Sequence, residues 1–185
     1  MKTLIFNGSP RKNGNTAALV DALSQRLGGE IKVVRAYDCD IRPCIDCRYC
    51  WKNRGCSIKD GMQALYRDID EADNIVIASP VNFSELTGQL LVVLSRLQMY
   101  WCAKYLRHEE PVPKKKRAGL ILVRGGSGPQ KLSAIDTGKM ILGDISATLC
   151  GVVMADNSDA VPSIRQEGVM EALDALADAL KQGEA

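Results

Sequence analysis

The stretch Gly8-Ser9-Pro10-Arg11-Lys12-Asn13-Gly14-Asn15-Thr16 follows a short apolar run, residues 3–7, and precedes a helical pattern that starts near residue 17. This order predicts a strand, a polar loop and the N-terminus of a helix. Such a loop directs backbone N–H groups toward one point, where the helix dipole also favours an anion. Its hydroxyl and amide side chains add hydrogen-bond donors, and Arg11 and Lys12 add positive charge. The stretch therefore predicts a phosphate site.

Two familiar phosphate-binding loops do not fit this stretch. A Walker loop has four residues between its glycines and then Lys and Ser or Thr, whereas five residues separate Gly8 from Gly14 here and Asn15 follows. The G-x-G-x-x-G turn of dinucleotide-binding sheets is missing as well. A looser nest of amides and hydroxyls around a terminal phosphate monoester fits better. The plainer alternative is an ordinary strand-to-helix turn in which Thr16 caps the helix.

The rest of the chain alternates between strand and helix patterns. We expect strands at residues 3–7, 30–37, 73–79, 118–124 and 150–155, and helices at residues 15–27, 61–71, 86–106, 131–149 and 164–182. Alternation of this kind predicts a parallel sheet covered on both faces. We therefore expect an α/β fold with a flavodoxin-like, doubly wound, five-stranded parallel sheet in the order 2-1-3-4-5. It would form one domain, residues 1–185, with a cysteine-rich insertion at about residues 38–60.

The composition is that of an ordinary globular protein, with 46% hydrophobic and 25% charged residues. A net charge of +2 gives no argument for binding to nucleic acid or membranes. No apolar run reaches the length of a membrane span, and the N-terminus lacks the features of a signal peptide. We therefore expect a cytoplasmic protein. The basic run at residues 114–117 is expected to be a solvated entrance to the next strand, with anion steering as the alternative.

The predicted helix at residues 86–106 is apolar on more than one face. A helix of this kind is buried on two sides. One side can be the sheet, and the other favours a partner subunit. We therefore expect a homo-oligomer.

Ligands of doubly wound sheets bind outside the carboxyl ends of the strands, where the strand order reverses. The loops at residues 8–16, 80–87 and 125–129 would meet there. Val81 and Phe83 would pack against a flat ring, and Gly125 and Gly126 would let backbone approach from the other side. A phosphate at one end and a planar ring at the other predict a mononucleotide, with FMN the natural candidate. The alternative for Phe83 is a place in the core.

Four of the seven cysteines lie within thirteen residues of one another: Cys44, Cys47, Cys50 and Cys56. An odd number of cysteines without a secretion signal argues against a disulfide framework. Three of them, spaced by three, are similar to the run by which ferredoxins hold a cubane cluster, and four thiolates suit either Fe–S or zinc. Structural zinc usually takes two cysteine pairs with a longer spacer, and a metal-free segment is the third alternative. The remaining cysteines are expected to be buried and without a role: Cys39, Cys102 and Cys150.

Taken together, these motifs resemble the NADPH-dependent FMN reductase superfamily, and more narrowly its iron–sulfur flavoprotein branch. The resemblance rests on residues 8–16, on Cys44-x-x-Cys47-x-x-Cys50 and on Ala78-Ser79-Pro80-Val81, and it runs from residue 1 to about residue 96. It implies that the FMN phosphate is bound by Ser9, Arg11, Asn13, Asn15 and Thr16. It implies that the isoalloxazine is contacted by Pro80, Val81, Asn82, Phe83, Gly125 and Gly126. It also implies a [4Fe–4S] cluster on Cys44, Cys47, Cys50 and Cys56, and a homodimer or homotetramer.

The activity that this resemblance implies is an FMN-dependent oxidoreductase. NAD(P)H or a small carrier would supply electrons, and a small acceptor would receive them, directly or through the cluster. No catalytic side chain is expected, because the cofactor carries the chemistry, and the lone His108 argues against a hydrolase triad. The alternative is a non-enzymatic FMN-binding electron carrier with a metal-free cysteine segment. An isoelectric point near 8.1 disfavours an acidic flavodoxin as that carrier.

Overall fold

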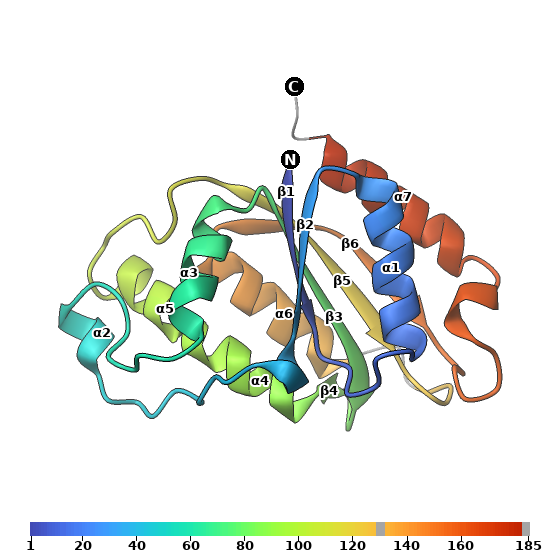
Figure 1. Ribbon diagram of the computed structural model, residues 1–185, viewed down its shortest axis with the longest axis horizontal. Coiled ribbons are helices and arrows are strands. Elements are labelled where there is room, and N and C mark those ends of the chain that lie inside the picture. Colours follow the sequence, from blue (N-terminus) through green and yellow to red (C-terminus); the bar gives the residue numbers. More distant parts are fainter. Residues whose placement is uncertain (129–131, 183–185) are drawn as a thin grey trace.

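The computed structural model describes residues 1–128 and 132–182 and contains one sheet with helices on both faces (Figure 1). Its five parallel strands have the order β2-β1-β3-β5-β6. Their bounds are Lys2–Asn7 for β1, Glu30–Arg35 for β2, Asn74–Asn82 for β3, Lys116–Val123 for β5 and Ala147–Ala155 for β6. The predicted flavodoxin-like α/β class and the order 2-1-3-4-5 are thus confirmed for the parallel strands. A short sixth strand, β4 (Glu85–Leu86), pairs antiparallel with β3 and was not predicted.

The central strands are buried on both faces, which explains their continuous apolar sequences. Residues 3–7 of β1 and residues 74–79 of β3 are all buried. The predicted strand at residues 73–79 was expected to end before Pro80, but β3 continues to Asn82. Strand β1 pairs with β3 only as far as Ala78, so one edge of β3 is free at Pro80. Proline is tolerated on such an edge because its missing N–H removes no ladder hydrogen bond.

The helices cover the two faces of the sheet in separate groups (Figure 1). Helices α1 (Asn15–Leu27) and α7 (Val169–Lys181) share one core with the side chains of one sheet face. The other core contains α3 (Met62–Glu71), α4 (Gly88–Leu94), α5 (Gln98–Tyr105) and α6 (Ser133–Asp144). In the part of the chain that the structure describes, no helix combines the length and apolarity that a membrane span requires.

Several predicted helices are shorter or broken. The stretch 86–106 divides into the end of β4, helix α4, the 3₁₀ turn η2 (Ser95–Leu97) and helix α5. Ser95 explains the break, since its hydroxyl donates to the Val92 carbonyl at 2.7 Å and so competes with the regular helix bonds. The stretch 131–149 contains α6, but its last residues belong to β6, and residue 131 lies outside the described residues. The final stretch begins as the 3₁₀ turn η3 (Ser163–Arg165) before α7.

Two further predictions about burial are wrong. Lys116, in the basic run expected to be solvated, is buried, and its ammonium donates to the carbonyls of Asp70 at 3.1 Å and Ala72 at 2.9 Å. Burial lowers the pKa of Lys116 to about 8. Of the three cysteines expected to be buried, Cys102 is, whereas Cys39 and Cys150 are half-buried.

Candidate functional site

A cavity of about 270 Å³ opens where the loops after β1, β3, β5 and β6 meet. Most of the predicted flavin-site residues line it: Ser9, Arg11, Asn15, Thr16, Pro80, Val81, Asn82 and Gly125. Three others do not line it: Asn13, Phe83 and Gly126. The carboxyl edge of the sheet therefore brings together residues from loops far apart in the sequence, as the strand order requires.

The N-terminus of α1 faces this cavity without a side-chain cap. The N-cap residue is Gly14, for which the structure gives no capping hydrogen bond from a side chain, so Thr16 is not the cap that the plainer alternative required. The first N–H groups of a helix have no partner within the helix and carry its positive dipole end. The N-terminus of α1 is therefore suited to an anion.

The loop after β1 is held in place by its own buried polar groups. Asn7 accepts a hydrogen bond from the Ser9 N–H at 2.9 Å, and the Ser9 hydroxyl lies 3.2 Å from both the N–H and the carbonyl oxygen of Arg11. Thr87 Oγ1 donates to the Gly8 carbonyl at 2.7 Å and so ties the loop to the start of α4. A Cβ at Gly8 would lie 2.7 Å from Leu90 Cδ2, so this position needs glycine.

Asn15 joins this loop to the segment after β6. Its amide nitrogen donates to the Ser158 carbonyl at 3.1 Å, and its amide oxygen accepts from the Ser163 N–H at 2.9 Å. The Ser163 hydroxyl returns a bond to the Asn15 carbonyl at 3.1 Å. The amide group of Asn15, which was predicted to bind a phosphate, is thus used to hold the segment of Ser158 and Ser163.

Sequence reasoning missed several residues that line the cavity: Pro10, Gly14, Thr87, Val123, Ser158 and Asp159. The polar run after the last strand was a usable signal, because that strand also ends at the carboxyl edge of the sheet. Gly125 is coupled to this segment, since a Cβ there would collide with the Asp159 carboxyl group. Backbone can therefore approach the cavity at residue 125.

Phe83 lies at the tip of the hairpin between β3 and β4, outside the lining of the cavity. Both Phe83 and Ser84 have left-handed backbone conformations, with φ of 51° and 66°. The Phe83 side chain is completely exposed, with a relative exposure of 105%. The alternative that placed Phe83 in the core is therefore wrong, and its contact with a flavin ring stays a prediction.

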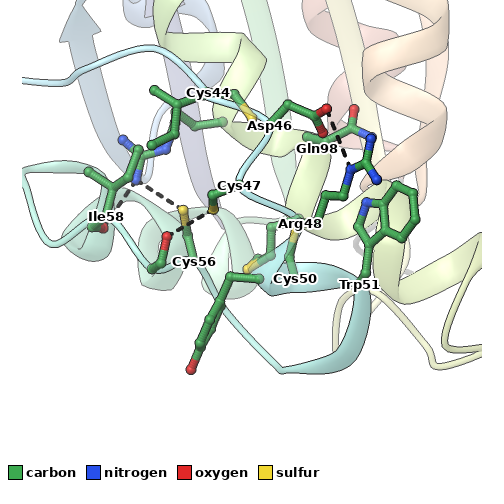
Figure 2. Close-up of a pocket in the computed structure, with 14 residues that line it drawn as sticks. Cys44, Asp46, Cys47, Arg48, Cys50, Trp51, Cys56, Ile58 and Gln98 are labelled. Carbon is green, nitrogen blue, oxygen red and sulfur yellow. Dashed lines mark hydrogen bonds and ion pairs between the residues drawn. The ribbon is translucent and has the colours of Figure 1, made fainter.

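The four clustered cysteines line a second, much smaller cavity, of about 20 Å³ (Figure 2). They lie in the irregular segment between η1 (Ala36–Asp38) and α3, which contains one helical turn, α2 (Tyr49–Lys52). Within residues 1–128 and 132–182, no three His, Cys, Asp or Glu side chains form a group that could hold a metal ion. The donors are of the right kind for an iron–sulfur cluster, but the cavity holds little more than a water molecule. The segment in this conformation does not fit a cluster.

Three of these thiols have hydrogen-bond partners inside the protein. Cys47 Sγ lies 3.1 Å from Ser57 Oγ, and this hydrogen bond lowers the pKa of the Cys47 thiol. Cys50 Sγ lies 3.5 Å from Cys102 Sγ, and burial together with Cys102 raises the pKa of Cys50 to about 12. Arg96 Nη2 donates to the Cys56 sulfur at 3.4 Å.

Arg96, in the 3₁₀ turn η2, contacts the cysteine segment at several points. Its fully buried guanidinium donates to the Arg42 carbonyl at 2.9 Å and the Ile58 carbonyl at 3.2 Å, and it pairs with the Asp60 carboxylate at 2.7 Å. Burial opposes the charge of Asp60, yet the hydrogen bond from Arg96 holds the pKa of that carboxyl below its usual value. One side chain therefore fixes both ends of the segment and Cys56. A lone arginine in the apolar stretch 86–106 was the available signal.

Comparison with known proteins agrees with this geometry. The model of the NADPH-dependent FMN reductase family matches residues 1–137. An iron-sulfur flavoprotein of Archaeoglobus fulgidus is 32% identical over 131 residues, which cover 69% of this chain and 56% of that protein. Iron-sulfur flavoprotein MJ0731 of Methanocaldococcus jannaschii is 31% identical over 138 residues, 72% of this chain and 67% of that protein. The chain thus spans between half and two thirds of these relatives.

Two solved structures share the fold at low sequence identity. RosB with a bound 8-demethyl-8-formylriboflavin-5'-phosphate has a TM-score of 0.71 at 20% identity, and the match covers 98% of this chain and 81% of RosB. NAD(P)H:quinone oxidoreductase from Methanothermobacter marburgensis has a TM-score of 0.69 at 16% identity, with 100% and 96% covered.

Proposed function

The chain belongs to the NADPH-dependent FMN reductase family, and on that premise we propose that it is an FMN-dependent oxidoreductase. It would take electrons from NAD(P)H or another reduced donor and pass them to a small acceptor. The observation that carries this proposal is the uncapped N-terminus of α1, which faces a cavity lined by Ser9, Arg11 and Thr16. These groups fit the phosphate of a mononucleotide, because amides, hydroxyls and one cation all favour a bound anion.

The opposite wall of the cavity suits the ring of the same ligand. Pro80, Val81 and Asn82 extend β3 beyond the end of β1 and offer apolar surface and backbone at one side. Gly125 offers close backbone approach at the other. When bound, FMN supplies the hydride and single-electron chemistry. Arg11 and Asp159 are the ionisable side chains among the lining residues, so the protein would mainly bind, orient and shield the ring.

We propose in addition that Cys44, Cys47, Cys50 and Cys56 hold a [4Fe–4S] cluster after the segment opens. Support comes from the four thiols that line one cavity and from the relatives, which are iron-sulfur flavoproteins by name. When bound, such a cluster supplies one-electron transfer. Iron and acid-labile sulfide measured on anaerobically purified protein test this part, and protein without either would contradict it.

The assembly and location that we propose are a homodimer or homotetramer in the cytoplasm. Exposed apolar side chains near both sites support a partner subunit, among them Phe83, Ile45 and Trp51. Sedimentation of the purified full chain with FMN tests the assembly, and a monomer at micromolar concentration would contradict it.

The phosphate assignment can be tested with paired variants. Ser9→Ala with Thr16→Ala should weaken FMN binding about a hundredfold or more, because each hydroxyl that binds a charged group contributes about 1.5–3 kcal/mol and the two together contribute at least about 3 kcal/mol. The matched control is Ser24→Ala, on the same helix, whose hydroxyl donates to the Val20 carbonyl at 2.8 Å. Fluorescence titration measures the FMN affinity of the double variant and of the control. Equal affinity in the two proteins would contradict the phosphate site.

A second candidate is a non-enzymatic FMN-binding electron carrier with a metal-free cysteine segment. It is favoured by the lack, among the described residues, of a side-chain group that could hold a metal ion. The two candidates differ in turnover. Steady oxidation of NAD(P)H with a quinone or free flavin as acceptor supports the oxidoreductase. Bound FMN that is reduced by dithionite but not by NAD(P)H supports the carrier.

A further inference from the structure

Cys50 and Cys102 form a contact that the cysteine spacing did not predict. They are fifty-two positions apart, yet their sulfurs lie 3.5 Å apart, with Cys50 as the donor. Cys102 lies on α5 and is buried, whereas Cys50 lies on α2 and is half-buried. We propose that these two residues are a dithiol pair that oxidises reversibly to a disulfide.

The structure holds the two cysteines next to each other through the contacts around α2. Arg107, which follows α5, donates through Nη1 to the Cys50 carbonyl and pairs with Glu109 at 3.1 Å. Glu109 also pairs with Arg54, just after α2, at 3.3 Å. These links tie the helical turn to the end of α5 from both sides. Bringing two residues fifty-two positions apart together costs chain entropy, and folding has already met this cost. Formation of the disulfide in the folded protein is therefore not opposed by it.

Only a small movement separates the contact from a bond. A disulfide has a sulfur–sulfur distance of about 2.0 Å, so the sulfurs must approach by about 1.5 Å. Helix α2 is a single turn, with Arg48 in a left-handed conformation before it and Asn53 in an extended conformation after it. Because α2 is one turn between two irregular residues, we place this movement on the side of Cys50.

Two of the other clustered cysteines have different partners, which favours the Cys50–Cys102 pair. Cys47 bonds to the Ser57 hydroxyl, and Cys56 bonds to the Arg96 guanidinium. In the described ranges, the hydrogen bonds of the structure include one contact between thiols, that of Cys50 with Cys102. At equilibrium in an oxidising buffer, the first disulfide expected to accumulate is therefore this one, because its two sulfurs are already in contact, and not a bridge within the Cys44–Cys56 segment.

A small-molecule disulfide such as glutathione disulfide is the class of oxidant that can reach the half-buried Cys50. A base of the buffer takes the Cys50 proton as the Cys50 sulfur attacks the oxidant, a slow step because the pKa of this thiol is raised; one glutathione thiolate is released and a mixed disulfide forms. The Cys102 thiolate then attacks the Cys50 sulfur and releases the second glutathione. The two cysteines lose two electrons and two protons, and the oxidant becomes two glutathione thiols.

The disulfide itself does not depend on the proposed function, but one consequence does. If Cys50 is one of four cluster ligands, oxidation removes it from that set and leaves three thiols. Oxidised protein would then take up less iron than reduced protein. The cysteine spacing groups Cys50 with Cys47, whereas the structure pairs it with Cys102. Cys50 would thus serve either as a cluster ligand or as a disulfide partner, but not as both at once.

The pair can be tested on the metal-free full chain. The protein is reduced with a chelator present, equilibrated in glutathione buffers of increasing oxidation, alkylated, and analysed by intact mass and peptide mapping. We expect a Cys50–Cys102 crosslink as the first disulfide in wild type and in the control Cys150→Ser. It should be missing in Cys102→Ala and in Cys50→Ser. A first disulfide within the Cys44–Cys56 segment, or none under oxidising buffer, would overturn the proposal.

Iron uptake then tests the consequence. Reduced and oxidised samples of wild type and Cys102→Ala receive ferrous iron and sulfide without further reductant. We expect the oxidised wild type to bind at least threefold less iron than the reduced wild type, and Cys102→Ala to show no such difference. Equal uptake by both wild-type samples would overturn the consequence. If no sample binds iron, the cluster proposal fails, whereas the mapped disulfide still decides the dithiol pair.

Discussion

The two candidate sites of this protein are held together in different ways. The larger cavity lies at the carboxyl edge of a sheet whose strands are buried on both faces, so its walls are fixed by the core. The cysteine segment contains one helical turn and is held by a few polar contacts, chief among them those of one fully buried side chain, Arg96. A site on strand ends can be in place before its ligand binds. A site on an irregular segment depends on a few polar contacts. In the structure, three of its four thiols bond to other protein groups and not to a ligand.

The largest effect expected from this difference follows removal of Arg96. Arg96→Met would leave Asp60 buried without its partner and release the carbonyls of Arg42 and Ile58. Breaking a buried ion pair on one side costs about 3–5 kcal/mol. We expect a loss of this size in the free energy of unfolding, measured with urea. We also expect the reduced variant to take up no iron in the uptake experiment described above.

The matched control is a surface ion pair of the same protein. Lys114 pairs with Asp73, and both side chains are about two fifths exposed, 42% and 40%, against 0% for Arg96. Lys114→Ala should cost less than about 1 kcal/mol. If Arg96→Met costs no more than Lys114→Ala, the view that one residue anchors the cysteine segment is wrong.

The second prediction concerns the larger cavity and its ligand. FMN at one hundred times its dissociation constant should raise the free energy of unfolding by about 2.7 kcal/mol, because it binds the folded state alone. The gain should disappear at that concentration in the double variant Ser9→Ala, Thr16→Ala. Thermal unfolding with and without FMN measures it. An equal gain in both proteins would place the ligand elsewhere.

These contrasts explain what the sequence could and could not predict. Apolar runs with turn residues between them identified the five parallel strands, and the strand order then placed the predicted loops at residues 8–16 and 80–87 together, of which Pro80, Val81 and Asn82 line the cavity as the end of β3. Ser158 was missed although the polar run after β6 was a usable signal, because its place at the cavity is set by the side chain of Asn15, which is distant in the sequence. Cys102 was missed for the same reason, since its partner is set by how α2 packs on α5.

The third prediction tests how tightly the loop after β1 is packed. A Cβ at Gly8 would meet Leu90 Cβ at 2.9 Å and Thr87 Oγ1 at 2.8 Å, so Gly8→Ala should cost about 1–3 kcal/mol of unfolding free energy. It should also weaken FMN binding, because the loop must move. Gly143→Ala on α6 is the control, since nothing lies within 4 Å of its added Cβ. Equal stability of the two variants would mean that the loop is not packed as described.

The smallest effect is expected at Phe83, where the cavity ends. The residue is in a left-handed conformation that non-glycine residues adopt at a cost, and its exposed ring has no packing to lose. Phe83→Gly relieves that strain but adds entropy to the unfolded chain. We therefore expect a change of less than about 1 kcal/mol in the free energy of unfolding.

The FMN affinity of the same variant tests whether the exposed ring contacts the ligand. The two-residue hairpin turn itself accounts for the positive φ of Phe83 and Ser84, so a contact is inferred instead from the complete exposure of the ring beside the cavity. If the ring contacts a bound isoalloxazine, Phe83→Gly and Phe83→Ala should both bind FMN several-fold more weakly at nearly unchanged stability. Fluorescence titration beside urea unfolding separates the two quantities. Unchanged affinity in both variants would contradict the predicted contact and would limit the flavin site to Pro80, Val81 and Asn82 on this side.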